Sequence, residues 1–271
     1  MYVTVLIDNN SRSGLLNEWG LSFYIEYGGH KYLLDTGGSA RFLENARSLG
    51  IDIASVDKAI LSHAHFDHSL GMEPFFKAND KACFYVSPNC AENCYSGRLF
   101  IQRYIGLPKG VLDCYAARIV RPFGVTRLDD GVWIVPHSAP CDRMVARKSH
   151  LYVRKGWRFV PDDFSHEQSL VFETGSGLAV FNSCSHSGPE VVIQEVLAAF
   201  PGRTVRAYFG GLHLFRLKTS DVKSVAERLR SCCVPEIYTG HCTGSAAMTI
   251  LKEYLGEGVC EMYSGLKVVI N

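Results

Sequence analysis

The sequence predicts an α/β (α+β) protein built from two halves, each with strands followed by a helix, that pack sheet against sheet with the helices outside. Three apolar runs near the start lead into a helical pattern, and a second strand, tight turn and helix follow later in the chain. No linker or low-complexity tract divides these units. We therefore expect one domain that spans residues 1–271.

The first half opens with three expected strands. They are the apolar runs YVTVLI from Tyr2, LSFYIEY from Leu21 and KYLLDTG from Lys31, and the third ends in a turn that contains glycine. Residues 40–49 then carry apolar side chains at helical spacing, and Gly50 stands where that helix would end. A further short strand, KAILS, leads straight into a cluster of histidines.

The second half repeats the order of strand, turn and helix. The apolar run GLAVFNS from Gly177 leads through SHSGP into VVIQEVLAAF, a helical pattern closed by Pro201 and Gly202. Residues 90–160 have the least regular pattern and are rich in arginine and aromatic residues. We expect this segment to be an elaboration that lies over a site and covers a substrate; an ordinary structural insertion is the alternative.

The composition is that of a globular protein with a substantial core, since 47% of the residues are hydrophobic and 20% are charged. The start, MYVTVLIDNN, lacks the pattern of a secretion signal, and no apolar stretch reaches the roughly 18 residues of a membrane span. These observations predict a cytoplasmic protein without membrane attachment. Its ten cysteines are then expected to be reduced, and the C-x3-C pair Cys90 and Cys94 has no second pair at zinc-ribbon spacing.

The net charge of +1 is unevenly spread along the chain. The segment from Arg98 to Arg158 holds 12 lysines and arginines against 4 aspartates, an excess of +8 that leaves −7 for the remainder. Such an excess attracts anions by long-range steering, so we expect an anionic small-molecule substrate; a solvated basic face is the alternative. No recognisable nucleic-acid module is present, which argues against a nucleic-acid partner. A homodimer is the expected assembly.

The stretch SHAHFDHSLG, from Ser62 to Gly71, predicts a metal site. In an extended chain residues i and i+2 point the same way, so His63 and His65 can hold one ion. Asp67 and His68 then need only a turn to face a second ion. Imidazole nitrogen and carboxylate oxygen suit zinc, iron and manganese. Three histidines and one aspartate within six residues are hard to explain by core packing.

This H-x-H-x-D-H spacing, preceded by a strand that ends in LLDTG, resembles the metallo-β-lactamase superfamily. The resemblance implies a four-layer αββα sandwich and extends over nearly the whole chain. It is closest to the subfamily that includes an archaeal synthase of the methanopterin pathway, which acts on a dihydropterin diphosphate and a ribosyl-aminobenzene phosphate. Five further stretches carry it: LIDNN at Leu6, NEWGLSFYIE at Asn17, SCSHSG at Ser183, GHCTG at Gly240 and GGLHLF at Gly210.

The resemblance also implies roles for individual residues. Asp35 would orient the metal ligands and the turn, and His63 and His65 would hold one ion. The other ion would be held by Asp67, His68 and His241. Chemistry supports His241 in part, because it follows the expected strand EIYT in a turn flanked by glycine, where an imidazole can project from a sheet edge.

The sequence departs from the superfamily where a bridging aspartate usually follows the second-half strand. It reads Asn182-Ser183-Cys184-Ser185-His186 instead, and the subfamily also has Cys-Ser-His here. His186 is therefore the preferred remaining ligand, and Cys184 is a lesser candidate. The cofactor expected is a pair of divalent ions, zinc first, with iron, manganese or magnesium, or a single ion, as alternatives.

Three other side chains are candidates near the site. His137 lies roughly where the superfamily places a third-motif histidine, with a surface-loop histidine as the alternative. His213 is expected to orient a ligand or contact substrate, or else to be a core histidine. Trp19 stands where the subfamily usually has histidine after Glu18, a change expected to alter substrate contacts and not the metal ligands.

The reaction expected from this ligand set is hydrolysis, because a divalent pair lowers the pKa of bound water and polarises a substrate oxygen. We expect Asp67 and His68 to act in catalysis, with Asp67 orienting the attacking water as well as binding metal. A synthase that uses a dihydropterin diphosphate is the first alternative, and a non-catalytic metal-binding protein is the second. The sequence does not identify which arginine would receive the anionic group.

Overall fold

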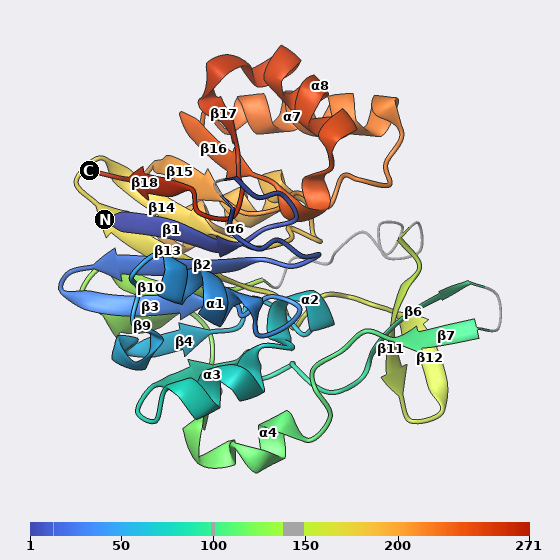
Figure 1. The fold of residues 1–271 in the computed structure, drawn as a ribbon. Coiled ribbons are helices and arrows are strands. Elements are labelled where there is room, and N and C mark those ends of the chain that lie inside the picture. Colours follow the sequence, from blue (N-terminus) through green and yellow to red (C-terminus); the bar gives the residue numbers. More distant parts are fainter. Residues whose placement is uncertain (13, 99–100, 138–148) are drawn as a thin grey trace.

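Two seven-stranded sheets lie face to face within residues 1–12, 14–98, 101–137 and 149–271, which the computed structural model describes (Figure 1). The first sheet has the order β18 (Lys267–Val269), β1 (Tyr2–Ile7), β2 (Ser22–Tyr27), β3 (His30–Leu34), β4 (Lys58–Ile60), β5 (Cys83–Tyr85) and β8 (Ile119–Val120). The second has the order β17 (Val259–Glu261), β16 (Glu236–Thr239), β15 (Val205–Phe209), β14 (Gly177–Phe181), β13 (Gln168–Thr174), β10 (Val132–Pro136) and β9 (Thr126–Asp129).

Helices cover the outer faces of both sheets. The helices beside the first sheet are α1 (Arg41–Ser48), α3 (Met72–Ala78) and α4 (Val111–Cys114). Those beside the second sheet are α6 (Pro189–Ala199), α7 (Thr219–Ser231) and α8 (Ser245–Leu255). The resulting layers of helix, sheet, sheet and helix confirm the predicted four-layer sandwich (Figure 1).

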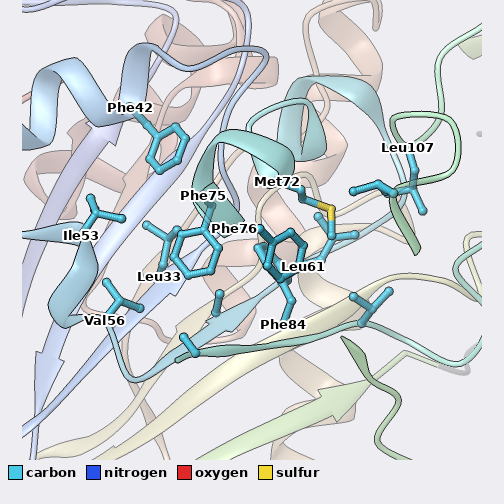
Figure 2. Close-up of a cluster of buried hydrophobic side chains, with 14 of the residues drawn as sticks. Leu33, Phe42, Ile53, Val56, Leu61, Met72, Phe75, Phe76, Phe84 and Leu107 are labelled. Atoms are coloured by element: carbon cyan, nitrogen blue, oxygen red, sulfur yellow. The ribbon is translucent and has the colours of Figure 1, made fainter. Parts of the chain in front are cut away.

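Side chains alternate along the strands, so that each sheet contributes to two apolar layers. Phe23 and Ile25 of β2 face the second sheet, where the stacked rings of Phe181 and Phe209 lie with centroids 4.4 Å apart. Tyr24, between them, packs instead in the layer under α1 and α3 that Figure 2 shows. Because full burial of such side chains contributes about 1.5–3 kcal/mol each, these layers hold the two sheets in a fixed relative position.

A third, four-stranded sheet stands beside the sandwich, at the right of Figure 1. Its order is β12 (Arg158–Pro161), β11 (Leu151–Lys155), β6 (Cys94–Arg98) and β7 (Ile101–Tyr104). The expected elaboration at residues 90–160 therefore holds only in part, because β8, β9 and β10 of that segment belong to the two central sheets. Residues 99–100 and 138–148 of the segment lie outside the described residues.

The central strands of both sheets run parallel, which brings their carboxyl ends to one edge. β3, β4 and β5 pair in parallel in the first sheet, as do β14, β15 and β16 in the second. Turns that follow such strands meet at a common edge, where ligands are usually bound. The histidine cluster follows β4, and three further histidine-containing turns follow β14, β15 and β16.

Candidate metal centre

The first-half ligands occupy a loop and one short helical turn. After β4 the chain continues through Ser62, and His63 and His65 lie in the loop before α2 (Phe66–Ser69). Asp67 and His68 belong to α2, and the side chains of all four candidate ligands are buried. Asp67 and His68 thus lie on a turn of helix, whereas His63 and His65 lie on the loop before it.

Asp35, which follows β3, connects the first-half ligands by hydrogen bonds. Its Oδ2 accepts from Ser62 Oγ at 2.7 Å and from His68 Nδ1 at 2.8 Å. Since the Ser62 hydroxyl donates to Asp35, the 2.8 Å contact between Ser62 Oγ and His63 Nδ1 requires a proton on His63 Nδ1. In its neutral form each imidazole therefore carries the proton on Nδ1 and leaves Nε2, the nitrogen that can bind a metal, unprotonated.

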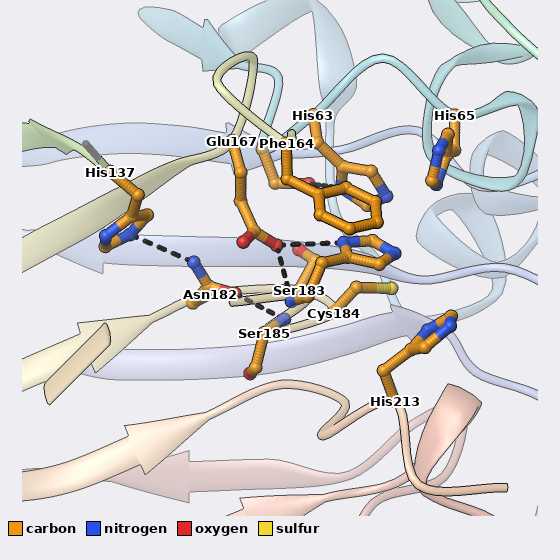
Figure 3. Close-up of polar contacts among 12 residues, drawn as sticks. His63, His65, His137, Phe164, Glu167, Asn182, Ser183, Cys184, Ser185 and His213 are labelled. Carbon is orange, nitrogen blue, oxygen red and sulfur yellow. Dashed lines mark hydrogen bonds and ion pairs between the residues drawn. The ribbon is translucent and has the colours of Figure 1, made fainter. Parts of the chain in front are cut away.

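His186, after β14, is fixed in the same manner by a buried carboxylate. Its Nδ1 donates to Glu167 Oε1 at 3.1 Å, which places the proton on Nδ1. Phe164 stacks on the imidazole, with ring centroids 4.4 Å apart and an interplanar angle of 11°. Figure 3 shows Glu167 and Phe164 beside the Ser183–Ser185 turn, with His63 next to them.

His241, after β16, is held by the turn that follows β1. Its Nδ1 contacts Asn9 Oδ1 at 2.9 Å, and the Asn9 Nδ2 donates back to the His241 carbonyl at 3.0 Å, which fixes the orientation of the amide. The backbone N–H of His241 donates to Asp8 Oδ2 at 3.0 Å. The stretch LIDNN thus positions a candidate ligand more than 230 residues away in the sequence.

The imidazoles gather into two neighbouring groups. The centroid of His63 lies 4.6 Å from that of His65 and 4.8 Å from that of His186. The ring of His68 lies 5.0 Å from that of His241, whose Nε2 is 3.5 Å from Asp67 Oδ2. His63 and His68 join the two groups, with centroids 4.2 Å apart.

Buried polar atoms in this cluster fit a bound metal pair. The Nε2 atoms of His63 and His65 are inaccessible to solvent and have no hydrogen-bond partner among the described residues. A buried nitrogen left in this way costs about 1–3 kcal/mol unless another partner satisfies it. A divalent ion is such a partner. His63, His65 and His186 would hold one ion, and Asp67, His68 and His241 the other.

The electrostatics of the cluster favour cation binding. Burial and the neighbouring histidines hold the pKa values of His63 and His65 well below the usual histidine value, so both are neutral at pH 7. Burial acts to raise the pKa of Asp67, but His68 and His241 outweigh it and hold that pKa well below its usual range. For His241, burial is outweighed by Cys242 and Asp67, which raise its pKa to about 9. A metal ion at His241 therefore displaces a proton.

Backbone strain is concentrated at the same turns. Asp35, Ser185, His213 and His241 have φ between 46° and 60°, in the left-handed region that residues other than glycine rarely adopt. Each such residue costs about 1–3 kcal/mol, and the cost persists only where surrounding contacts enforce it. The strained residues follow β3, β14, β15 and β16, so the strain lies in the turns that carry or adjoin the cluster residues.

Two histidine candidates are placed differently from the cluster ligands. Both ring nitrogens of His137 are engaged elsewhere, Nδ1 with Glu195 Oε2 at 2.8 Å and Nε2 with Ser169 Oγ at 2.7 Å. Figure 3 shows His137 on the far side of Asn182 from His63 and His65. His213 lies beside His186, with centroids 4.5 Å apart, and is partly exposed in the pocket described below.

The structure adds residues that the sequence interpretation did not select. Asp162, His166 and Glu167 lie between β12 and β13 and are buried against the histidine loop. His166 Nδ1 accepts from the backbone N–H of Ala64 at 3.2 Å, and its Nε2 donates to Asp162 Oδ2 at 3.1 Å. Both of its nitrogens are thus used in positioning the loop. The only sequence signal was a histidine with three acidic residues in DDFSHE.

A pocket of about 340 Å³ opens over the cluster. It is bordered by Asp67, His186 and His241, and by Arg103 of β7 and Arg216. Trp19 and Phe215 form an aromatic wall, with ring centroids 5.1 Å apart, and Trp19 also lies 5.2 Å from the ring of His241. The four-stranded sheet thus contributes to the pocket, which has the volume of a small-molecule site.

Sequence comparison assigns the chain to a family. A sequence profile described as the metallo-beta-lactamase superfamily matches residues 20–178. The chain belongs to this superfamily. Superfamily members usually bind divalent metals, and clusters of histidine, cysteine and aspartate of the required kind are present here.

Individual relatives agree with this placement. The chain is 27% identical over 261 residues to 7,8-dihydropterin-6-methyl-4-(beta-D-ribofuranosyl)-aminobenzene-5'-phosphate synthase of Methanocaldococcus jannaschii, covering 92% of this chain and 89% of the synthase. Tm1679, described as a metal-dependent hydrolase of the beta-lactamase superfamily, matches in structure with a TM-score of 0.80 at 25% identity, over 100% of this chain and 99% of that chain. A diphosphatase of the PhnP family shares the fold, with a TM-score of 0.57 at 16% identity and coverage of 100% and 98%.

These relatives are enzymes with different reactions, so the superfamily indicates an enzyme without specifying which one. Within the described part of the chain, no helix is long and apolar enough to span a bilayer.

Proposed function

We propose that the protein is a metal-dependent hydrolase of an anionic, phosphorylated small molecule. The observation that carries the proposal is the pocket in which Arg103 and Arg216 face the same space as Asp67, His186 and His241. Guanidinium groups bind phosphate and carboxylate groups through paired hydrogen bonds. Arg103 belongs to the basic segment expected to attract an anion, whereas Arg216 comes from the second half of the chain.

Bound divalent ions would supply a water nucleophile at neutral pH and neutralise charge on the substrate. The residues of the chain would orient these partners. Asp67, ionised and at the border of the pocket, is placed to accept a hydrogen bond from the attacking water. The two arginines would stabilise the negative charge that develops on the substrate or its leaving group.

Not every arginine of the basic segment is available for this task. Arg118 donates to the carbonyl oxygens of Asn79 and Ala82, and Arg121 donates to those of Ser87 and Cys90. These side chains stabilise the fold. Among the basic residues of the segment that the structure describes, Arg103 is the one that borders the pocket.

A second candidate function is that of a synthase that acts on a dihydropterin diphosphate. The relative from Methanocaldococcus jannaschii, which is named as such a synthase, supports it. The aromatic wall of Trp19 and Phe215 also supports a substrate with a flat ring, because aromatic side chains stack on such rings. We also propose a cytoplasmic location, which suits both candidate functions. All nine cysteines in the described residues are free thiols, as is usual in that compartment.

Zinc-loaded protein tested against phosphodiesters, diphosphates, lactones and a dihydropterin diphosphate separates the candidates. We expect turnover of a phosphorylated compound without a second organic substrate, and Arg103→Ala or Arg216→Ala to lower kcat/KM about 10-fold to 100-fold, since a charged hydrogen bond contributes about 1.5–3 kcal/mol. Arg158→Ala, on the exposed face of β12, is the matched control. Turnover only when an aromatic amine is added would favour the synthase, and protein that binds metal without any turnover would favour a binding role.

A further inference from the structure

A second cavity adjoins the metal pocket. It has a volume of about 300 Å³ and is lined by Phe66, Leu70 and residues 103–109. The two hollows share a wall, formed by Phe66, Arg103 and Ile105. Side chains that border the metal pocket but not the second cavity include Cys184, His213 and Arg216. A substrate too long for the metal pocket would therefore continue past Arg103 into the second cavity.

Hydrogen bonds fix the walls of the second cavity. The backbone N–H of Phe66 donates to the Ile105 carbonyl at 2.9 Å, which ties α2 to the segment after β7. Tyr104 Oη donates to the Leu107 carbonyl at 2.6 Å. A Cβ at Gly106 would lie only 2.7 Å from Tyr104 Oη, so glycine is needed for this close approach. The cavity is thus formed before a ligand binds, which lowers the entropy cost of binding.

Apolar side chains make up much of the lining. Phe66 and Leu70 contribute from α2 and its C-terminal end, and Leu107 and Pro108 contribute from the segment after β7. The Leu70 side chain is 38% exposed, so a ligand in the cavity would remove apolar surface from water. The second cavity therefore favours a ligand with an apolar body.

The charged side chains of the lining are cations. They are Arg103, in the shared wall, and Lys109, and no described residue of the lining is acidic. Lys109 Nζ lies 3.8 Å from the ring centroid of Tyr104 and donates to the Glu92 carbonyl at 2.9 Å. The Glu92 carboxylate accepts instead from the backbone N–H of Gly110 at 2.7 Å. Because an ammonium group has three N–H donors, Lys109 keeps donors for an anionic ligand.

We propose that the second cavity binds the remote part of the substrate, an apolar body that ends in an anionic group. The reacting phosphoryl group would lie in the metal pocket beside Arg103, and the remote anion would meet Lys109. This inference rests on the proposed hydrolase and specifies its substrate class. Contacts with a part of the substrate that does not react raise kcat/KM, because their binding energy helps to hold the reacting group in place.

Phosphonates, which are not hydrolysed, test the inference by binding alone. Alkylphosphonates of increasing length are compared with ω-carboxyalkylphosphonates of the same lengths by calorimetric titration of the zinc-loaded protein. In the wild type we expect affinity to rise about threefold for each methylene that enters the cavity, and the terminal carboxylate to add about fivefold. A bisphosphonate of matched length shows whether Lys109 prefers a phosphate to a carboxylate.

Two variants alter the second cavity without changing a residue of the metal pocket. Lys109→Gln is expected to abolish the gain from the terminal carboxylate, and Leu70→Trp, which fills the cavity, to abolish the gain with chain length. Lys77→Gln, an exposed position on α3 outside both hollows, is the control. Equal affinities for the two series in the wild type, or gains that persist in both variants, would overturn the inference.

The outcomes separate this inference from the proposed function. Affinity gains that depend on Lys109 and Leu70, without turnover of any phosphorylated compound, would refute the hydrolase and keep the second cavity as a ligand site. Turnover with phosphonate affinities that are independent of both residues would keep the hydrolase and refute the second cavity. A wild type that binds none of the phosphonates would refute both. Circular dichroism checks that each variant is folded.

Discussion

The two halves of the candidate metal centre supply their side chains in different ways. In the first half, residues 62–71 place three histidines and Asp67 on one loop and one turn of helix. In the second half, His186 and His241 follow two separate strands, β14 and β16, and reach the cluster because these strands lie in one parallel sheet. A local cluster can therefore be recognised as a motif, whereas dispersed ligands depend on the order of strands.

The largest effect is expected from removing the local cluster. His65→Ala combined with His68→Ala takes a ligand from each ion, and we expect loss of most bound metal and a fall in kcat/KM of more than about 100-fold. His241→Ala affects one ion, so about one ion per chain should remain. Elemental analysis of the purified proteins measures the difference, with His30→Ala, whose side chain is 49% exposed, as control. Full metal content in the double variant would show that the cluster does not hold metal.

The carboxylates that orient the histidines should also differ in their effect on metal affinity, with the larger effect in the first half. Asp35 accepts from His68, Ser62 and Ser183, and so connects both halves. Glu167 orients His186 and none of the other candidate ligands. The contact with His186 lowers the pKa of Glu167 to about 2, although burial acts to raise it. We expect Asp35→Asn to weaken metal affinity about 100-fold and Glu167→Gln about 10-fold. Chelator competition measures both constants. A larger effect for Glu167→Gln would mean that Asp35 does not connect the halves.

Ionic strength is expected to have a smaller effect on kcat/KM. This effect tests whether the basic segment, unlike the rest of the molecule, attracts the substrate. If Arg103 steers an anionic substrate, kcat/KM should fall about threefold as ionic strength rises from about 0.05 M to about 0.5 M, because the Debye length shortens from more than about 10 Å to a few ångströms. Inorganic phosphate should inhibit competitively, and Arg103→Ala should reduce the salt dependence. A neutral substrate without salt dependence or phosphate inhibition would mean that the basic segment is a solvated face.

The last effect is on stability and not on activity, and it concerns an ion pair between the two central sheets. Lys58 of β4 contacts both carboxylate oxygens of Asp129 in β9 at 2.8 Å, and Tyr32 donates to Asp129 at 2.6 Å. Burial acts to raise the pKa of Asp129, but Lys58 and Tyr32 hold it below the usual value. A depressed pKa stabilises the folded state above the unfolded pKa of about 3.9, and this contribution disappears as pH falls through the folded pKa.

Asp129→Asn should therefore cost about 1 kcal/mol at pH 7, the upper end for a partly exposed pair, and nearly nothing at an acidic pH below the folded pKa of Asp129. Urea unfolding of the metal-free proteins at both pH values measures this, and Asp130→Asn, whose side chain is 98% exposed, is the control. An equal cost at both pH values would assign the effect to packing and not to charge.

Much of the fold could be predicted because its central strands have distinct apolar patterns. The expected strand YVTVLI coincides with β1, the expected helix at 40–49 contains α1, and GLAVF is β14. The third sheet could not be predicted, since it forms by pairing Ser96 of β6 with the distant Leu151 of β11. Short polar strands of this kind gain their stability from neighbours that no local pattern specifies.

The candidate site could be predicted where its side chains lie close together in the sequence. The sequence selected the side chains that face the cluster from residues 63–68, whereas the resemblance to a family was needed for His186 and for most of the argument about His241. Asp162 and His166 were missed because buried acidic and histidine side chains resemble a polar loop until their partners are known. Counting charges also did not separate Arg103, which borders the pocket, from Arg118, which binds backbone carbonyls.

The pairing of β18 with β1 has a consequence for the newly made chain. Tyr2 lies opposite Val269, so this edge of β1 stays open until residue 269 has left the ribosome. His63 and His68 are made well before His241. A growing chain therefore carries an exposed strand edge and an incomplete set of ligands, two features that favour misassembly. If these residues bind metal as proposed, the complete set of donors forms only after His241 has been made, shortly before β18 can close this edge of the first sheet.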